Sequence, residues 1–228
     1  MSPLEVQARD EICRVGKSLF DRGYVHATAG NISVRLDDGY LITPTDACLG
    51  TLEPTRLARL DASGAQIAGD RASKTIALHT HIYKATAAFE PAVRCIIHTH
   101  SSHCVALTLS GAPVSAALGA ELLGPITPYF VMKVGHVPLL PYHRPGDPAV
   151  AALVGQTITR YAQQGVLLRA VMLTRLGPNV WHQSPAAAMA TLEELEETAR
   201  LRILAGPTVS DLCAADLSAL AQQFGCVW

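Results

Sequence analysis

The sequence lacks the segments that mark exported or membrane-spanning chains. Its first ten residues are polar and hold no apolar stretch of the kind found in a secretory signal. No uninterrupted apolar run approaches the roughly 18–20 residues that span a bilayer. The formal net charge of −1 gives no overall attraction to nucleic acid or to anionic membranes. We therefore expect a cytoplasmic protein without a nucleic-acid or membrane partner, in which any anion site is local.

Cysteine motifs are also missing, although cysteine itself is present. The six cysteines are scattered and include no Cys-x-x-Cys pair, so neither a zinc ribbon nor a redox motif is indicated. Because no signal sequence is seen, we expect free thiols. Neither an internal repeat nor a low-complexity linker divides the chain. With 228 residues, of which 49% are hydrophobic and 16% charged, the composition indicates one compact domain with extensive buried surface.

Histidine, in contrast, is concentrated in one part of the chain. Of the nine histidines, five fall within 25 positions, and an apolar run leads straight into His98-Thr99-His100. On an extended strand alternate side chains share a face, so His98 and His100 would point the same way, with Cα atoms roughly 6–7 Å apart. This spacing suits two imidazoles that converge on one Zn²⁺. The alternative is a buried strand that merely ends in two histidines.

Hydrophobic periodicity predicts a mixture of helices and strands. Apolar residues at three- and four-residue spacing indicate a helix over 4–22, and a further helix is expected to begin at Ser73 as its N-cap. The proline-rich stretch 125–147 is expected to form short strands and loops. The other predicted helices cover 101–109, 149–164 and 185–204, with a short one possible over 214–224, and the other predicted strands begin near 32, 39, 57, 167 and 180.

Two separate segments are suited to binding an anion. Gly30-Asn31 can bring backbone amides close to a ligand just before a strand begins. A serine, a lysine and a threonine, residues 73–75, stand at the expected start of a helix, where anions are stabilised. An ordinary turn and a helix start that binds only water are the alternatives.

Five separated motifs occur along the chain: TAGNIS at 28–33, ITPT at 42–45, SK at 73–74, IHTH at 97–100 and LGP at 176–178. Taken together, these motifs resemble the class II aldolase/adducin family. Further similarity, in 127–132, 141–147 and 193–198, is to the branch of this family that decarboxylates 3-oxo-tetronate 4-phosphate. The resemblance covers roughly residues 5–206, so we expect one domain over 1–206 and a tail over 207–228.

The resemblance implies a fold and a site. The fold would be a three-layer α/β/α sandwich with a central antiparallel sheet, assembled as a homotetramer whose active sites lie at the subunit interfaces. A divalent metal, which we expect to be Zn²⁺, would be bound by His98 and His100. Tyr129, which matches a tyrosine contributed across the interface, would be the proton donor. The phosphate pocket would consist of Asn31, Thr45, Ser73 and Lys74.

Three positions depart from the family pattern. The family's catalytic glutamate falls at Thr75 and its third metal histidine at Leu176, and neither side chain can perform the corresponding task. Asp46 stands where glycine is usual, so its carboxylate must turn away from a phosphate, pair with Lys74, or mark a different substrate. The third metal ligand would then be His136, which replaces an amide of related sequences, or His79. For each of these two, an ordinary surface or core histidine is the alternative.

The function that the resemblance implies is that of a carbon-carbon lyase. We expect a metal-dependent decarboxylase of a phosphorylated 3-oxo sugar acid that yields dihydroxyacetone phosphate and CO₂. Decarboxylation needs no base to remove a proton before the C–C bond breaks, so it tolerates threonine at position 75. A class II sugar-phosphate aldolase is the second hypothesis, and a catalytically inactive adducin-like scaffold is the third.

Overall fold

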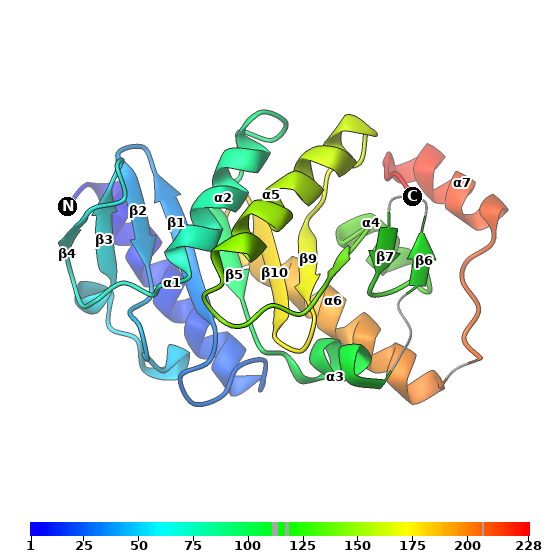
Figure 1. Ribbon diagram of the computed structural model, residues 1–228, viewed down its shortest axis with the longest axis horizontal. Helices are drawn as coiled ribbons and strands as arrows, with labels where there is room; N and C mark the ends of the chain where they lie inside the picture. The colour runs from blue at the N-terminus through cyan, green and yellow to red at the C-terminus, as the bar shows by residue number, and fades with distance from the viewer. Residues whose placement is uncertain (111–113, 117–118, 207) are drawn as a thin grey trace.

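The computed structural model describes residues 1–110, 114–116, 119–206 and 208–228. Its centre is an eight-stranded sheet, which helices cover on both faces (Figure 1). The strands of this sheet are β1 (Asn31–Leu36), β2 (Gly39–Ile42), β3 (Ala58–Asp61), β4 (Gln66–Ala68), β5 (Cys95–His98), β8 (Leu139–Leu140), β9 (Ala170–Leu173) and β10 (Gly177–His182). A separate two-stranded sheet pairs β6 (Val114–Ala116) with β7 (Gly119–Glu121).

The order of strands in the main sheet is β4-β3-β2-β1-β5-β10-β9-β8. Neighbouring strands run antiparallel, except that β8 and β9 at one edge are parallel. The predicted antiparallel central sheet is thus confirmed, with one parallel pair that the sequence does not reveal. In the middle of the sheet β5 lies between β1 and β10, so the end of β5 is flanked by residues of both neighbours.

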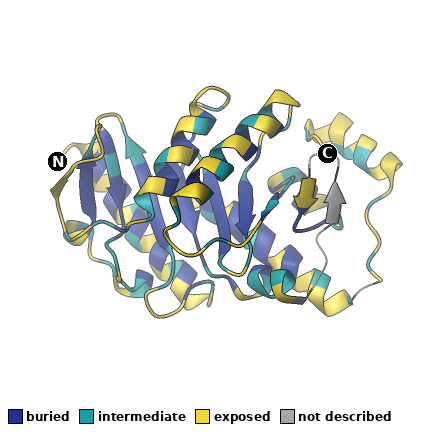
Figure 2. Cartoon of the chain, in the orientation of Figure 1, coloured by how far each residue is buried: buried dark blue, intermediate teal, exposed yellow. Residues whose placement is uncertain are grey.

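The helices form two layers around the sheet. On one face α2 (Ile76–Ala87) packs against α5 (Pro148–Gln163), and on the other α1 (Pro3–Asp21) and α3 (Ser102–Ser110) pack against α6 (Pro185–Ala205). Figure 2 shows the central strands of the sheet buried between helices whose outer surfaces are exposed. The remaining helices are α4 (Pro128–Lys133), α7 (Ala214–Phe224) and the 3₁₀ turns η1 (Leu49–Thr51) and η2 (Pro54–Arg56).

Alternation along the central strand divides the core in two. Ile97 joins the core that includes Leu19 and Leu192 of α1 and α6, whereas its neighbour Ile96 joins the core that includes Tyr83 and Tyr161 of α2 and α5. The predicted α/β/α sandwich follows from this division. No helix in the described ranges is long and apolar enough to cross a membrane.

Two details of the predicted secondary structure are wrong. The helix expected to begin at Ser73 begins at Ile76, because the backbone N–H of Ser73 is held by the carbonyl of Thr43 at 3.2 Å and an isolated bridge joins Pro44 to Ala72. The stretch 125–147 contains the helix α4 in addition to strands and loops. Its N-cap Thr127 accepts a hydrogen bond from the backbone N–H of Phe130, and a proline follows the cap, as is typical of a helix start. The strand-forming residues around it predict strands and loops instead.

Candidate active site

One cavity of about 620 Å³ collects most of the residues singled out in the sequence. It lies where the loop before β1, the end of β5, the start of α2 and the start of α5 meet. Its wall brings together residues from four motifs that are separated in the chain. The predicted site residues that line it are Asn31, Thr45, Ser73, Lys74, His98 and His100.

The two histidines converge within this cavity. β5 ends at His98, so His100 is not on the strand as predicted, yet the ring centroids lie 5.1 Å apart with planes inclined at 68°. A nitrogen ligand about 2.0–2.1 Å from Zn²⁺ puts the imidazole centroid roughly 3.2 Å from the ion, so two such rings at a tetrahedral angle lie about 5 Å apart. The observed separation is therefore the one expected for two ligands of a single ion.

The surroundings of His98 fix its protonation. Its Nδ1 lies 3.0 Å from the carbonyl oxygen of Pro178, which can only accept, so Nδ1 carries the hydrogen and Nε2 keeps a lone pair. Burial lowers the pKa of His98 to about 4, and repulsion from His100 adds to this effect, while the hydrogen bond to Pro178 opposes it. The ring is neutral at pH 7. A carbonyl behind one ring nitrogen and a lone pair on the other is the usual arrangement of a metal-binding histidine.

Backbone hydrogen bonds assemble the other side of the cavity. The N–H of Thr45 donates to the carbonyl of Arg71 at 2.8 Å, and the bridge between Pro44 and Ala72 joins the same two segments. These contacts place Thr45 beside the segment that carries Ser73 and Lys74. The four predicted phosphate-binding residues consequently face one space although three segments supply them.

Thr75, which stands where the family has a carboxylate, connects this group. Its Oγ1 accepts a hydrogen bond from Nδ2 of Asn31 and one from Oγ of Ser73, each at 3.3 Å. Threonine at this position therefore holds two phosphate-binding candidates in place. From the sequence, Thr75 indicates only the loss of a carboxylate, because the partners of its hydroxyl group depend on the tertiary structure.

The charges around the cavity are predominantly on exposed side chains. Lys74 and Arg144 both line it and are exposed, and neither is in an ion pair within the described part of the chain. Asp46 lines it as well, in a left-handed backbone conformation with φ of 56°. Of the three outcomes considered for Asp46, an ion pair with Lys74 is thus not observed in this structure. Arg144 is a cation of the cavity to which the sequence analysis assigns no role.

Apolar side chains also line the cavity. Leu176 lines the cavity together with Leu173 of β9 and Leu78 of α2. The position of the missing third histidine therefore belongs to the site, but its side chain cannot bind a metal. Within the described residues, no group of three histidine, cysteine, aspartate or glutamate side chains is placed to hold a metal ion as it stands.

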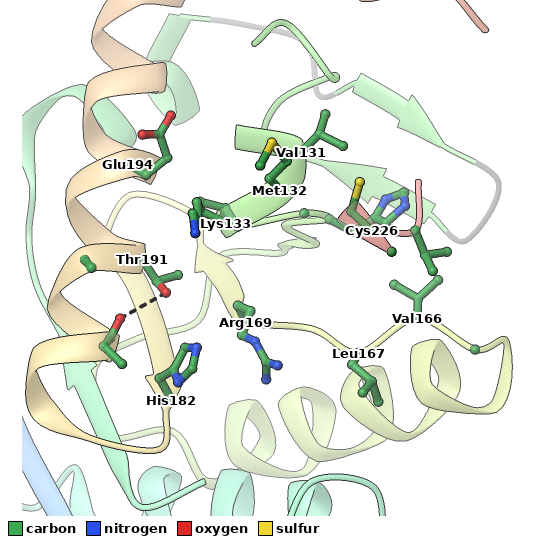
Figure 3. A pocket seen from close by; sticks show the side chains of 18 residues that line it. Val131, Met132, Lys133, Val166, Leu167, Arg169, His182, Thr191, Glu194 and Cys226 are labelled. Carbon is green, nitrogen blue, oxygen red and sulfur yellow. Dashed lines mark hydrogen bonds between the residues drawn. The ribbon is translucent and has the colours of Figure 1, made fainter. Parts of the chain in front are cut away.

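His136 lies elsewhere in the molecule. It lines a second cavity of about 640 Å³ that shares no residue with the first, and Arg169 and His182 project into that cavity (Figure 3). The Nδ1 of His136 lies 2.8 Å from a carboxylate oxygen of the buried Glu121, and its ring stacks on Trp228 with centroids 4.3 Å apart. The structure does not bring His136 to the histidine pair within one chain, so its role as third ligand stays a prediction for a site shared between chains.

His79 and Tyr129 also lie outside the first cavity. His79 is fully buried on the inner side of α2, where its Nδ1 is 2.7 Å from the hydroxyl of Ser33 and its Nε2 has no partner among the described residues. Burial, with a smaller effect of His98, lowers the pKa of His79 to about 3. Tyr129 is 62% exposed on α4 and lines neither cavity. Its role as a proton donor across an interface stays a prediction.

Asn179 is a residue of this region that the sequence analysis misses. It lies on β10 directly opposite His98 and is fully buried, and neither atom of its side-chain amide has a partner among the described residues. A buried amide without partners costs stability, so it is expected where it serves a ligand or a water. The signal in the sequence is a polar residue between Pro178 and Val180 inside a buried strand.

Comparisons with known proteins find a matching family and similar relatives. The family described as Class II Aldolase and Adducin N-terminal domain matches residues 10–203. The 3-oxo-tetronate 4-phosphate decarboxylase of Cupriavidus necator is 52% identical over 197 residues, which cover 86% of this chain and 84% of the relative. The protein of the same name from Escherichia coli K12 is 38% identical over 205 residues, or 89% of each chain.

Solved structures show the same fold. The crystal structure of YgbL from Klebsiella pneumoniae matches with a TM-score of 0.83 at 38% identity, over 95% of this chain and 98% of that one. An L-fuculose 1-phosphate aldolase matches with a TM-score of 0.78 over 99% of this chain and 98% of that one. At 22% identity the second likeness concerns the fold alone.

Proposed function

Because the chain belongs to the class II aldolase and adducin family, we propose that it is a carboxy-lyase that converts 3-oxo-tetronate 4-phosphate to dihydroxyacetone phosphate and CO₂. The observation that carries the proposal is the 52% identity, over 86% of the chain, to a decarboxylase of this substrate. The cavity supports it, because it combines a cationic side with an apolar wall and two neutral histidine ligands.

The reaction breaks one C–C bond and forms one C–H bond. The bond to the carboxylate carbon breaks, and its electron pair stays on the neighbouring carbon, which becomes part of an enediolate as CO₂ leaves. A proton donor then delivers a proton to that carbon and completes the hydroxymethyl ketone. No base has to remove a proton first, so the reaction does not need a carboxylate at Thr75.

The phosphate is held on the polar side of the cavity. Lys74 supplies a positive charge, and the hydroxyls of Ser73 and Thr45 are available as donors. Asn31 is oriented by its hydrogen bond to Thr75. Leu176 adds an apolar side chain to the lining, and an uncharged product such as CO₂ requires no polar partner there.

The residues present suit a divalent cation at the histidine pair. His98 and His100 would hold it, since Nε2 of His98 keeps its lone pair and the two rings are at the separation of two ligands. Such a cation, which we propose to be Zn²⁺, would act as a Lewis acid toward substrate oxygens and stabilise the negative charge of the enediolate. Pro178 contributes by fixing the tautomer of His98, and thereby the nitrogen that faces the cavity.

We also propose a cytoplasmic homotetramer in which Tyr129 of one chain donates the proton at the site of its neighbour. The support is that Tyr129 is 62% exposed and lines neither of the two cavities of its own chain. Light scattering on active protein tests the assembly. A fully active monomer would exclude Tyr129 as a donor across an interface.

The decisive experiment measures products rather than substrate loss. Purified protein supplied with Zn²⁺ and 3-oxo-tetronate 4-phosphate should release CO₂ and dihydroxyacetone phosphate in equal amounts. His98→Ala and His100→Ala should each lower turnover at least about a hundredfold, because a Lewis acid contributes several kcal/mol. His81→Ala, at an exposed position of α2, is the matched control and should be fully active.

Other products would point to the other hypotheses. Cleavage of a sugar phosphate to an aldehyde without CO₂ would make the protein an aldolase. Absence of turnover and of metal binding, even after metal supplementation, would favour the inactive scaffold.

A further inference from the structure

A third histidine, His26, lies beside His100. The ring of His26 is 6.4 Å from that of His100 between centroids, with planes inclined at 72°, and His26 is exposed. Its ring has no hydrogen-bond or ion-pair partner among the contacts of the described residues. Three histidine rings thus follow one another in space, His98, His100 and His26, although more than 70 positions separate the last from the others in the chain.

The backbone under His26 is held against the histidine segment. Val25 is buried, and the N–H of Ala29 donates to the carbonyl of His26 at 2.9 Å in a turn that gives Ala27 a left-handed φ of 48°. Gly30 packs so closely that a Cβ there would lie 2.9 Å from the carbonyl oxygen of His98. The backbone of residues 25–30 is therefore fixed against the histidine segment, while the exposed ring of His26 is free to rotate.

From this placement we infer that His26 is the third protein ligand of the metal site, in place of the side chain that is lost at Leu176. The inference rests on the proposed function, since it names a ligand of the same site. Two rings bound to one Zn²⁺ have centroids about 5 Å apart at a tetrahedral angle and at most roughly 6.4 Å apart. A shift of about 1 Å in the exposed ring of His26 brings it to the tetrahedral separation from His100.

This assignment completes the number of ligands that a catalytic zinc site requires. Such sites have three protein ligands and keep one position open for water or substrate. His98, His100 and His26 would supply three nitrogens. The fourth position would then be available to a substrate in the cavity that Lys74 and Ser73 line.

Zinc affinity, measured without substrate, tests the inference. Zn²⁺ is titrated into the metal-free full-length protein in competition with a chromophoric chelator, and circular dichroism confirms that each variant is folded. We expect His26→Ala to weaken Zn²⁺ binding about tenfold or more. The matched control is His81→Ala, an exposed histidine outside the cavity, which should bind Zn²⁺ as tightly as the parent.

A second variant gives a positive signal. Cysteine is also a zinc-type ligand, so His26→Cys should bind Co²⁺ and show an intense near-ultraviolet thiolate-to-cobalt absorption. His81→Cys, which adds an exposed thiol elsewhere, should show no such band beyond that of the parent.

The outcomes separate this inference from the proposed function. If the parent binds Zn²⁺, His98→Ala abolishes binding and His26→Ala binds within about twofold of the parent, the inference is wrong and the proposed function stands. Absence of the charge-transfer band in His26→Cys would overturn the inference in the same way. If the parent itself binds neither Zn²⁺ nor Co²⁺, the proposed metal-dependent function fails, and the ligand assignment fails with it.

Discussion

Gly177 makes the closest backbone contact of the site, and its replacement by alanine should damage both the fold and the histidine pair. Its φ is +141°, and a Cβ there would lie 1.9 Å from the carbonyl oxygen of Thr99 and 3.2 Å from Cα of His100. The N–H of Thr99 also donates to the carbonyl of Pro178 at 3.3 Å. An alanine methyl group at this point must push the segment that carries the histidines away from β10.

The cost has two parts. A side chain in this glycine-only backbone region costs about 1–3 kcal/mol. Loss of the hydrogen bond between Thr99 and Pro178 adds about 0.5–1.5 kcal/mol. We therefore expect Gly177→Ala to lower the free energy of unfolding by about 1.5–4.5 kcal/mol, as measured by urea denaturation, and to weaken Zn²⁺ binding.

Gly165→Ala is the control for backbone strain alone. Gly165 has φ of +81° and nothing within 4 Å of the position of a Cβ, so alanine there costs only the left-handed conformation, about 1–2 kcal/mol. Zinc affinity should not change in this variant. If Gly177→Ala were as stable as Gly165→Ala and bound Zn²⁺ like the parent, the close packing of β10 on the histidine segment would not support the site.

Two other predictions concern Lys74 and the buried histidine of α2. Lys74→Ala should raise KM about tenfold or more with little change in kcat, because a phosphate contact is made equally in ground and transition states; a normal KM with a collapsed kcat would refute this. Burial lowers the pKa of His79 from 6.5 to about 3, so its neutral ring stabilises the fold fully above pH 6.5 and this stabilisation is lost as the pH falls toward 3. The unfolding free energy of the metal-free parent should fall between pH 7 and pH 5, and His79→Gln should make this fall smaller by about 2 kcal/mol, whereas His81→Gln should not change it. An equal dependence of the unfolding free energy on pH in both variants would contradict the prediction.

Local patterns were sufficient to predict most of the elements and the histidine pair. The helices α1, α5 and α6 follow from apolar spacing, and β5 from an apolar run that ends in His98. The short strand β4 is exposed along its whole length, so no alternation of apolar and polar residues announces it. The helix α4 has one turn and a half, which is too short for a periodic signal, and only its cap at Thr127 indicates a start.

The environment of the site residues could not be predicted in this way. Contact between His26 and His100 depends on a turn with an alanine in the left-handed conformation and on the packing of Gly30, and neither is encoded in the spacing of the histidines. Similarly, His136 is drawn to the other cavity by Glu121 and by Trp228 at the end of the chain. Both are long-range contacts that sequence periodicity does not report.

The two departures from the family pattern have a common physical consequence. Thr75 and Leu176 put uncharged side chains where the family has a carboxylate and an imidazole, and both line the same cavity. Without the carboxylate, the phosphate group of a substrate meets Lys74 with one fewer negative charge nearby, and Thr75 still orients Asn31 and Ser73 through its hydroxyl. A reaction that begins with loss of CO₂ needs no base at that point. The altered residues therefore fit a decarboxylase better than an aldolase, with the third metal ligand supplied by His26 as inferred above.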